Sequence, residues 1–259
     1  MPEIIFPRFK RGRILKTEIL ENLRDFPRDA LDCYCENLSS GIVSGLSPIV
    51  DKDFITFSKG VIKYNGSLYL VRDLAAIQYG TTDKEVAIKV VFDHAEDKHD
   101  YTAQYFEFHV DDNISIADNE IELCRFKLKQ GAYLRSNYQD LYDLTTEYNT
   151  INVVNVVYAG YRQPTMSHLI FKYFAKEVLS CNPPNNSDVS FAMLCMNSAR
   201  IERDVVLYYL WNRLALRNLP HSLTNHEIHE HLVQVLAIVK REGMARKRPL
   251  SQKPRVLLD

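Results

Sequence analysis

One stretch decides the fold that we predict: Gly60-Val61-Ile62-Lys63-Tyr64-Asn65-Gly66-Ser67-Leu68-Tyr69-Leu70. An Asn-Gly pair between two apolar runs is typical of a type I′ hairpin, because both central residues of that turn have positive φ. Just before the hairpin, residues 54–59 alternate between two faces, which is the period of a β-strand. We therefore expect an antiparallel scaffold with structural turn positions at Gly41, Gly45, Gly60, Asn65 and Gly66.

The hairpin belongs to a series of short strand-like runs between residues 41 and 135. Further runs cover residues 75–79, 85–92, 105–110 and 121–128. In the last of these the apolar residues change face partway, which predicts a β-bulge. Short strands separated by turn residues are typical of a sandwich or barrel.

Helical periodicity precedes this β-region. Apolar residues recur at helical spacing over residues 14–38, and Pro27 interrupts them, so we predict two short helices that meet at Phe26-Pro27. After the β-region, the β-branched run 151–157 fits either a strand or a helix, and we favour a strand.

Three helices are predicted after residue 164. The first ends before Pro183-Pro184, and a long second helix runs from Ser187 or Asp188 to about Leu216. The third starts at Thr224 or Asn225 and continues through residue 240. Short connections between them predict a small bundle.

The predicted fold class is therefore α+β, in four segments. Residues 1–40 form an N-terminal helical arm, and residues 41–163 form a central antiparallel β-sandwich or barrel-like domain. Residues 164–243 form a C-terminal three-helix domain, and residues 244–259 form a basic flexible tail.

Composition excludes some classes of protein. The chain has 259 residues, of which 46% are hydrophobic and 25% charged, as in an ordinary globular protein. A net charge of −1 disfavours a general nucleic-acid binder, which usually carries a basic excess. We expect no membrane span, no secretory signal and reduced thiols at the five scattered cysteines, hence synthesis in the cytoplasm.

The histidine-rich stretch His226-Glu227-Ile228-His229-Glu230-His231 is the first candidate for chemistry. A zincin needs two histidines at i and i+4 with a glutamate between them, whereas His226 and His229 are three apart. We interpret the stretch as the first turn of a helix, where Glu227 and Glu230 oppose the helix dipole. If the chain held a metal here, His226 and His229 would be its ligands.

The acidic loop 93–100 is the second candidate. Its carboxylates would suit a hard metal, but the order of ligands and the central glycine of an EF-hand are missing, so we interpret it as a solvated hairpin loop. Cys33-Tyr34-Cys35 lacks the spacing of a zinc knuckle, and neither a Gly-x-Ser-x-Gly elbow nor a phosphate-binding loop occurs. We therefore predict no catalytic residue and no cofactor.

Aromatic and apolar residues outside the predicted core suggest protein contacts instead. The basic N-terminal arm carries large apolar side chains, which are unfavourable in water unless a partner covers them. The chain also has 15 tyrosines, a residue type that is enriched at protein interfaces. The predicted interface residues are Ile4, Ile5, Phe6, Phe9, Tyr133, Tyr138 and Tyr142.

Residues 5–130 resemble baseplate and fibre-attachment proteins of contractile bacteriophage tails and tail-like bacteriocins. The resemblance lies in GIVSGL (41–46), FITFSKGVIKYNGSLYLV (54–71), FKRGRIL (9–15) and IELCRFKL (121–128). It implies a non-enzymatic structural component of a contractile injection system, in the baseplate or between baseplate and tail fibres. Its implied partners are other tail, baseplate or fibre proteins, in multiple copies of a symmetric assembly. The protein would be made in the bacterial cytoplasm and then join the particle.

Two alternatives of other classes stay open at this point. A metal-dependent hydrolase would use the His226/His229 region or the 93–100 loop. A carbohydrate-binding module would hold sugar on aromatic side chains of the β-region.

Overall fold

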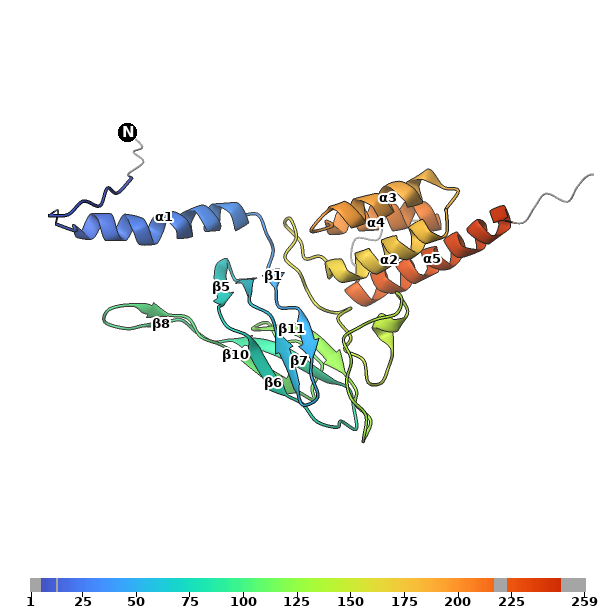
Figure 1. Ribbon diagram of the computed structural model, residues 1–259, viewed down its shortest axis with the longest axis horizontal. Coiled ribbons are helices and arrows are strands. Elements are labelled where there is room, and N and C mark those ends of the chain that lie inside the picture. Colours follow the sequence, from blue (N-terminus) through green and yellow to red (C-terminus); the bar gives the residue numbers. More distant parts are fainter. Residues whose placement is uncertain (1–5, 13, 217–222, 248–259) are drawn as a thin grey trace, which may run out of the picture.

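The computed structural model describes residues 6–12, 14–216 and 223–247 of the chain. Within these ranges a mixed α/β structure contains small antiparallel sheets, one N-terminal helix and four C-terminal helices (Figure 1). The strands that the structure describes form small antiparallel sheets and no closed barrel, so the barrel-like alternative is wrong.

Three sheets of three strands and one two-stranded ribbon make up the β-region. The first has the order β1 (Gly41–Gly45), β4 (Gly60–Tyr64), β5 (Ser67–Val71). The second has the order β2 (Pro48–Val50), β3 (Phe54–Phe57), β6 (Ala75–Gln78), and the third the order β10 (Phe106–Asp111), β7 (Val86–Phe92), β11 (Glu120–Phe126). The ribbon pairs β8 (Glu96–Asp97) with β9 (Thr102–Ala103), so the loop predicted at 93–100 includes a short hairpin.

The hairpin of β4 and β5 turns at Asn65 and Gly66, whose φ angles are 46° and 81°. Both angles are positive, as a type I′ turn requires. Gly45 has φ 72°, and a Cβ there would lie 2.0 Å from the carbonyl oxygen of Lys59. Only glycine therefore allows β1 to approach β4 this closely.

The bulge predicted in residues 121–128 is confirmed. The pairing of β11 with β7 shifts register between Glu122 and Cys124, and Ile121, Leu123 and Cys124 are all buried. The predicted strand over residues 151–157 is wrong, because only isolated bridges form there. Four of its apolar side chains nevertheless lie in the core: Ile151, Val153, Val154 and Val156.

The N-terminal helix differs from the prediction. A single helix, α1 (Thr17–Cys35), runs through Pro27. Proline removes one backbone hydrogen bond, but α1 is exposed to water along its length, so the freed carbonyl group can be solvated.

Between residues 164 and 216 and between 223 and 247 the structure has four helices instead of the predicted three: α2 (His168–Ser180), α3 (Asn186–Asn197), α4 (Arg203–Leu214) and α5 (Asn225–Lys247). The predicted long helix breaks because Ser198 is extended and the chain turns to bury Ile201, whose carbonyl accepts a hydrogen bond from the Thr165 hydroxyl. The cap of α3 is Asn185, not Ser187 or Asp188, because the Asn185 side chain accepts from the Ser187 N–H.

Thr224 caps α5 in a capping box with Glu227, which confirms that predicted start. The helix continues to Lys247, so the first residues of the predicted flexible tail are helical. One cluster of buried side chains extends from the sheets into α2, α3, α4 and α5. The division into four segments stays a prediction.

Candidate assembly surface

Helix α1 presents an uncovered apolar face. Its large apolar residues are between 44% (Leu23) and 80% (Tyr34) exposed, and the others are Leu20, Phe26 and Leu31. Cys35 is its one buried residue. At about 100° per residue these five positions fall on one side of the helix.

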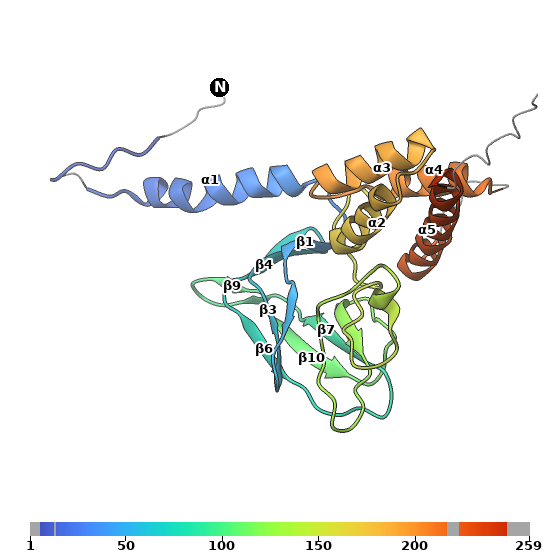
Figure 2. The same cartoon turned by 45° about the vertical axis from the view of Figure 1, so that its right-hand side comes forward.

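No helix or strand in the described ranges packs along α1. In Figure 1 the helix extends away from the sheets and from α2 to α5, and in Figure 2 most of its length projects beyond the rest of the fold. Amphipathic helices in globular proteins owe most of their stability to a packed apolar face. The face of α1 therefore lacks the partner that such a face normally has.

The segment before α1 adds to this surface. Phe6 and Pro7 line a small recess of about 170 Å³ together with Leu23, Phe26 and Pro27 of the helix. Phe6 and Phe9 are 78% and 60% exposed. Ile4 and Ile5, also predicted as interface residues, lie outside the described residues. Between Phe6 and Lys16 the sequence contains basic residues and no carboxylate, so a basic segment precedes the apolar face of α1.

Lys63 attaches α1 to the β-region. Its ammonium group comes from β4, is buried, and donates to the carbonyl oxygens of Cys35 (2.6 Å) and Glu36 (2.9 Å). The last carbonyl groups of a helix have no partner within it and carry partial negative charge, so a cation there is stabilising. The backbone continues this attachment, since Ser39 N–H donates to the Gly160 carbonyl.

The three predicted interface tyrosines have different surroundings. Tyr133 is 67% exposed, and Tyr142 is partly exposed with the Lys240 ammonium 5.2 Å from its ring centroid. Tyr138 is buried, and its hydroxyl donates to the Ile151 carbonyl at 2.7 Å. Burial raises the pKa of the Tyr138 hydroxyl. Its assignment to an interface is therefore wrong, because the ring belongs to the core.

The histidine pair does not form a metal site in the structure. His229 is buried, and its Nε2 lies 3.0 Å from the Leu141 carbonyl oxygen, whereas His226 is exposed beside Glu230. Burial lowers the pKa of His229, so its imidazole is neutral at pH 7. Within residues 6–12, 14–216 and 223–247, no three side chains of His, Cys, Asp or Glu gather as metal ligands would.

The loop 93–100 uses its polar groups locally. The Lys98 ammonium pairs with Glu96, and the Thr102 hydroxyl donates to Asp97 at 2.7 Å. All residues from 93 to 100 are exposed. The cysteines are free, and burial raises the pKa of the Cys124 and Cys195 thiols.

Sequence reasoning missed Lys63, which fixes α1 to the sheet. A lysine inside an alternating strand carries no local signal that it will be buried under the end of a distant helix. Its role follows only from the tertiary arrangement.

The chain resembles two solved structures in its overall arrangement. One is a crystal structure of TssK, with a TM-score of 0.41 and 8% sequence identity over 92% of this chain and 69% of that chain. The other is a chain of the TssK–TssF–TssG baseplate subcomplex of the type VI secretion system, with a TM-score of 0.46 and 9% identity over 92% of this chain and 100% of that chain. Similarities at this level do not assign a function.

No family model matches the sequence, and no curated protein matches it. None of the helices in the described ranges is both long and apolar enough to span a membrane.

Proposed function

We propose that this chain is a non-enzymatic structural component of the baseplate of a contractile, phage-tail-like particle, within the baseplate or linking it to tail fibres. The observation that carries the proposal is the uncovered apolar face of α1 together with Phe6 and Phe9. The class of assembly comes from the resemblance of residues 5–130 to baseplate and fibre-attachment proteins.

The geometry of α1 suits docking into a neighbouring protein. Burying a leucine or phenylalanine contributes about 1.5–3 kcal/mol each, so a partner that covers this face would gain substantial affinity. Lys63 fixes the carboxyl end of the helix, which limits the number of directions in which α1 can point. A partly fixed helix loses less conformational entropy on binding than a free segment does.

The partners are other baseplate, tail or fibre proteins, and multiple copies join a symmetric assembly. A complementary partner presents an apolar groove, because aromatic side chains anchor such interfaces, with acidic residues beside it to match the basic segment before α1. The protein is made in the bacterial cytoplasm and then joins the particle.

The proposal is tested by complementing a deletion of the gene in the producing strain and examining particles by electron microscopy. The double variant Leu23→Asp/Phe26→Asp places charge on the apolar face. Leu74→Asp is the matched control, because Leu74 is 63% exposed and lies in the β5–β6 connection.

We expect the deletion and the double variant to give tails without a complete baseplate or fibres, and the control to give complete tails. Complete, active particles in the deletion strain would contradict the proposed function. Complete particles with the double variant alone would contradict the role of α1.

A further inference from the structure

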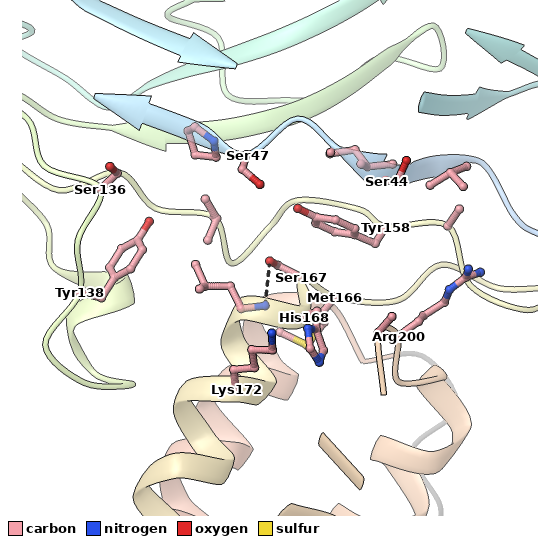
Figure 3. A pocket seen from close by; sticks show the side chains of 18 residues that line it. Ser44, Ser47, Ser136, Tyr138, Tyr158, Met166, Ser167, His168, Lys172 and Arg200 are labelled. Carbon is pink, nitrogen blue, oxygen red and sulfur yellow. Dashed lines mark hydrogen bonds between the residues drawn. The ribbon is translucent and has the colours of Figure 1, made fainter. Parts of the chain in front are cut away.

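A second feature, separate from α1, is a cavity of about 500 Å³ between the β-region and the start of α2. Strand β1 and residues 47–48 line one wall, residues 136, 138, 153, 158 and 159 line another, and the start of α2 with residues 166–167 and 199–200 lines a third. Its volume lies within the range of small-ligand sites. Figure 3 shows the side chains that face it.

Three nitrogen-bearing side chains line the cavity: His168, Lys172 and Arg200. Figure 3 shows His168 and Lys172 on α2 and Arg200 at one end. The lining includes no aspartate or glutamate. Glu202, which follows Arg200 closely, instead accepts a hydrogen bond from the Tyr161 N–H at 2.7 Å.

The lining gives its two permanent cations no counter-charge. Within the described ranges, neither the Lys172 ammonium nor the Arg200 guanidinium pairs with a carboxylate. The buried Lys89, by contrast, pairs with Asp111 and Glu120. Lys172 and Arg200 therefore keep their full capacity to attract an anion.

Three serines add hydroxyl groups to the lining of the cavity. Ser44, Ser47 and Ser136 come from the opposite walls (Figure 3), and their hydroxyls make no hydrogen bond with another part of the described chain. Buried apolar side chains such as Ile42, Val153 and Met166 complete the lining. Electrostatic attraction is stronger beside such low-dielectric walls than in open water.

His168 acts as a neutral hydrogen-bonding group at pH 7. Its Nε2 lies 2.9 Å from the Cys195 carbonyl oxygen, which can only accept, so Nε2 carries the proton of the neutral ring. Burial, and then the charge of Lys172, lowers the pKa of His168. The positive charge of the cavity therefore comes from Lys172 and Arg200.

We propose that this cavity binds an anionic ligand, whose phosphate or carboxylate groups pair with Lys172 on α2 and with Arg200 at the other end of the cavity. These groups come either from a small phosphorylated ligand or from acidic side chains of a partner. The proposal does not depend on α1 or on the proposed baseplate role.

Isothermal titration calorimetry of the full chain with two probes tests the proposal and separates the two sources. The probes are inorganic pyrophosphate and a tri-glutamate peptide with blocked ends. The variants are Lys172→Gln and Arg200→Gln. Lys176→Gln is the matched control, because Lys176 is exposed one turn later on α2 and does not line the cavity.

We expect saturable binding of at least one probe, weakened at least about fivefold by Lys172→Gln and by Arg200→Gln, because each removes a charge-assisted hydrogen bond. Lys176→Gln should change the affinity less than about twofold, since exposed and distant charges are screened. Pyrophosphate binding alone indicates a small phosphorylated ligand, and peptide binding alone an acidic partner. Binding of neither probe, or equal weakening by Lys176→Gln, would overturn the proposal.

Lys172 is exposed and Arg200 is half-buried, so both variants should keep the fold. Thermal unfolding of each variant checks this. A second measurement, probe affinity against salt concentration, should show affinity falling as salt rises. An affinity that does not change with salt would also overturn an electrostatic site.

Discussion

Helices α1 and α2 are both amphipathic, yet they use their apolar faces differently. The 13 residues of α2 bury five side chains in the core: Ile170, Phe171, Phe174, Ala175 and Val178. The 19 residues of α1 bury one, Cys35. The same kind of sequence pattern is thus covered within the chain in α2 and left exposed in α1.

The N-terminal end of α1 is also less well fixed than that of α2. The Ser167 side chain caps α2, whereas Lys16 gives α1 no side-chain cap. The other end of α1 is held by Lys63 of a distant strand. Helix α1 is therefore attached at one end only, as expected of an element that docks elsewhere.

The largest expected effect concerns α2. Phe174 is fully buried, and its ring meets those of Phe191 and Tyr209 with centroids 5.9 Å and 6.1 Å away. Phe174→Ala should lower the free energy of unfolding by about 3–5 kcal/mol, because it leaves a cavity among aromatic rings. Urea unfolding measures this. A loss below about 1 kcal/mol would mean that α2 is not packed as described.

Removing the Lys63 attachment of α1 should lower the free energy of unfolding less than Phe174→Ala does. Lys63→Met leaves the carbonyl groups of Cys35 and Glu36 without their buried donor, which costs about 1–3 kcal/mol. Hydrogen exchange at the last turn of α1 should become faster. Lys59→Met, at an exposed position of the same β-region, is the control and should leave exchange unchanged. Unchanged exchange in both variants would contradict the attachment.

Acid should weaken the helical part through its buried histidines. The folded-state pKa of His229 is lowered from 6.5, mainly by burial, and that of His168 is lowered likewise. Below about pH 6.5 the unfolded chain therefore binds more protons than the folded one, and stability falls as pH decreases.

His229→Gln should reduce the drop in melting temperature between about pH 7.5 and about pH 5.5. The remaining drop includes the contribution of His168, which this variant does not change. His226→Gln, on the exposed side of the same helix, is the control. An identical drop in wild type and His229→Gln would contradict a buried neutral histidine.

The smallest expected effect on stability lies in α1. Phe26→Ala should change the free energy of unfolding of the isolated chain by less than about 0.5 kcal/mol, because the ring is 54% exposed. The same variant should join particles poorly. A stability loss similar to that of Phe174→Ala would show that the chain covers its own helix.

Local sequence patterns correctly predicted those structural elements that depend only on neighbouring residues. The Asn65-Gly66 hairpin, the bulge near Glu122 and the Thr224 cap depend on neighbouring residues, and all three are present. Predictions from hydrophobic periodicity were wrong where contacts between residues far apart in the sequence determine the backbone path. The break before Ile201 and the irregular path of 151–157 serve burial in a shared core.

The assembly surface was only partly predictable for the same reason. Phe6, Phe9 and Tyr133 are exposed, but nothing local distinguished them from Tyr138, which hydrogen-bonds within the core. The uncovered face of α1 was unpredictable, because an apolar stripe looks the same whether its partner is in the chain or outside it.

Hydrogen exchange of the isolated chain and of the purified particle tests the central claim most directly. We predict that the amides of residues 17–35 exchange rapidly in the isolated chain and become protected in the particle. The amides of residues 168–180 should be protected in both. Equal exchange of residues 17–35 in the two samples would contradict the claim that α1 docks into a partner.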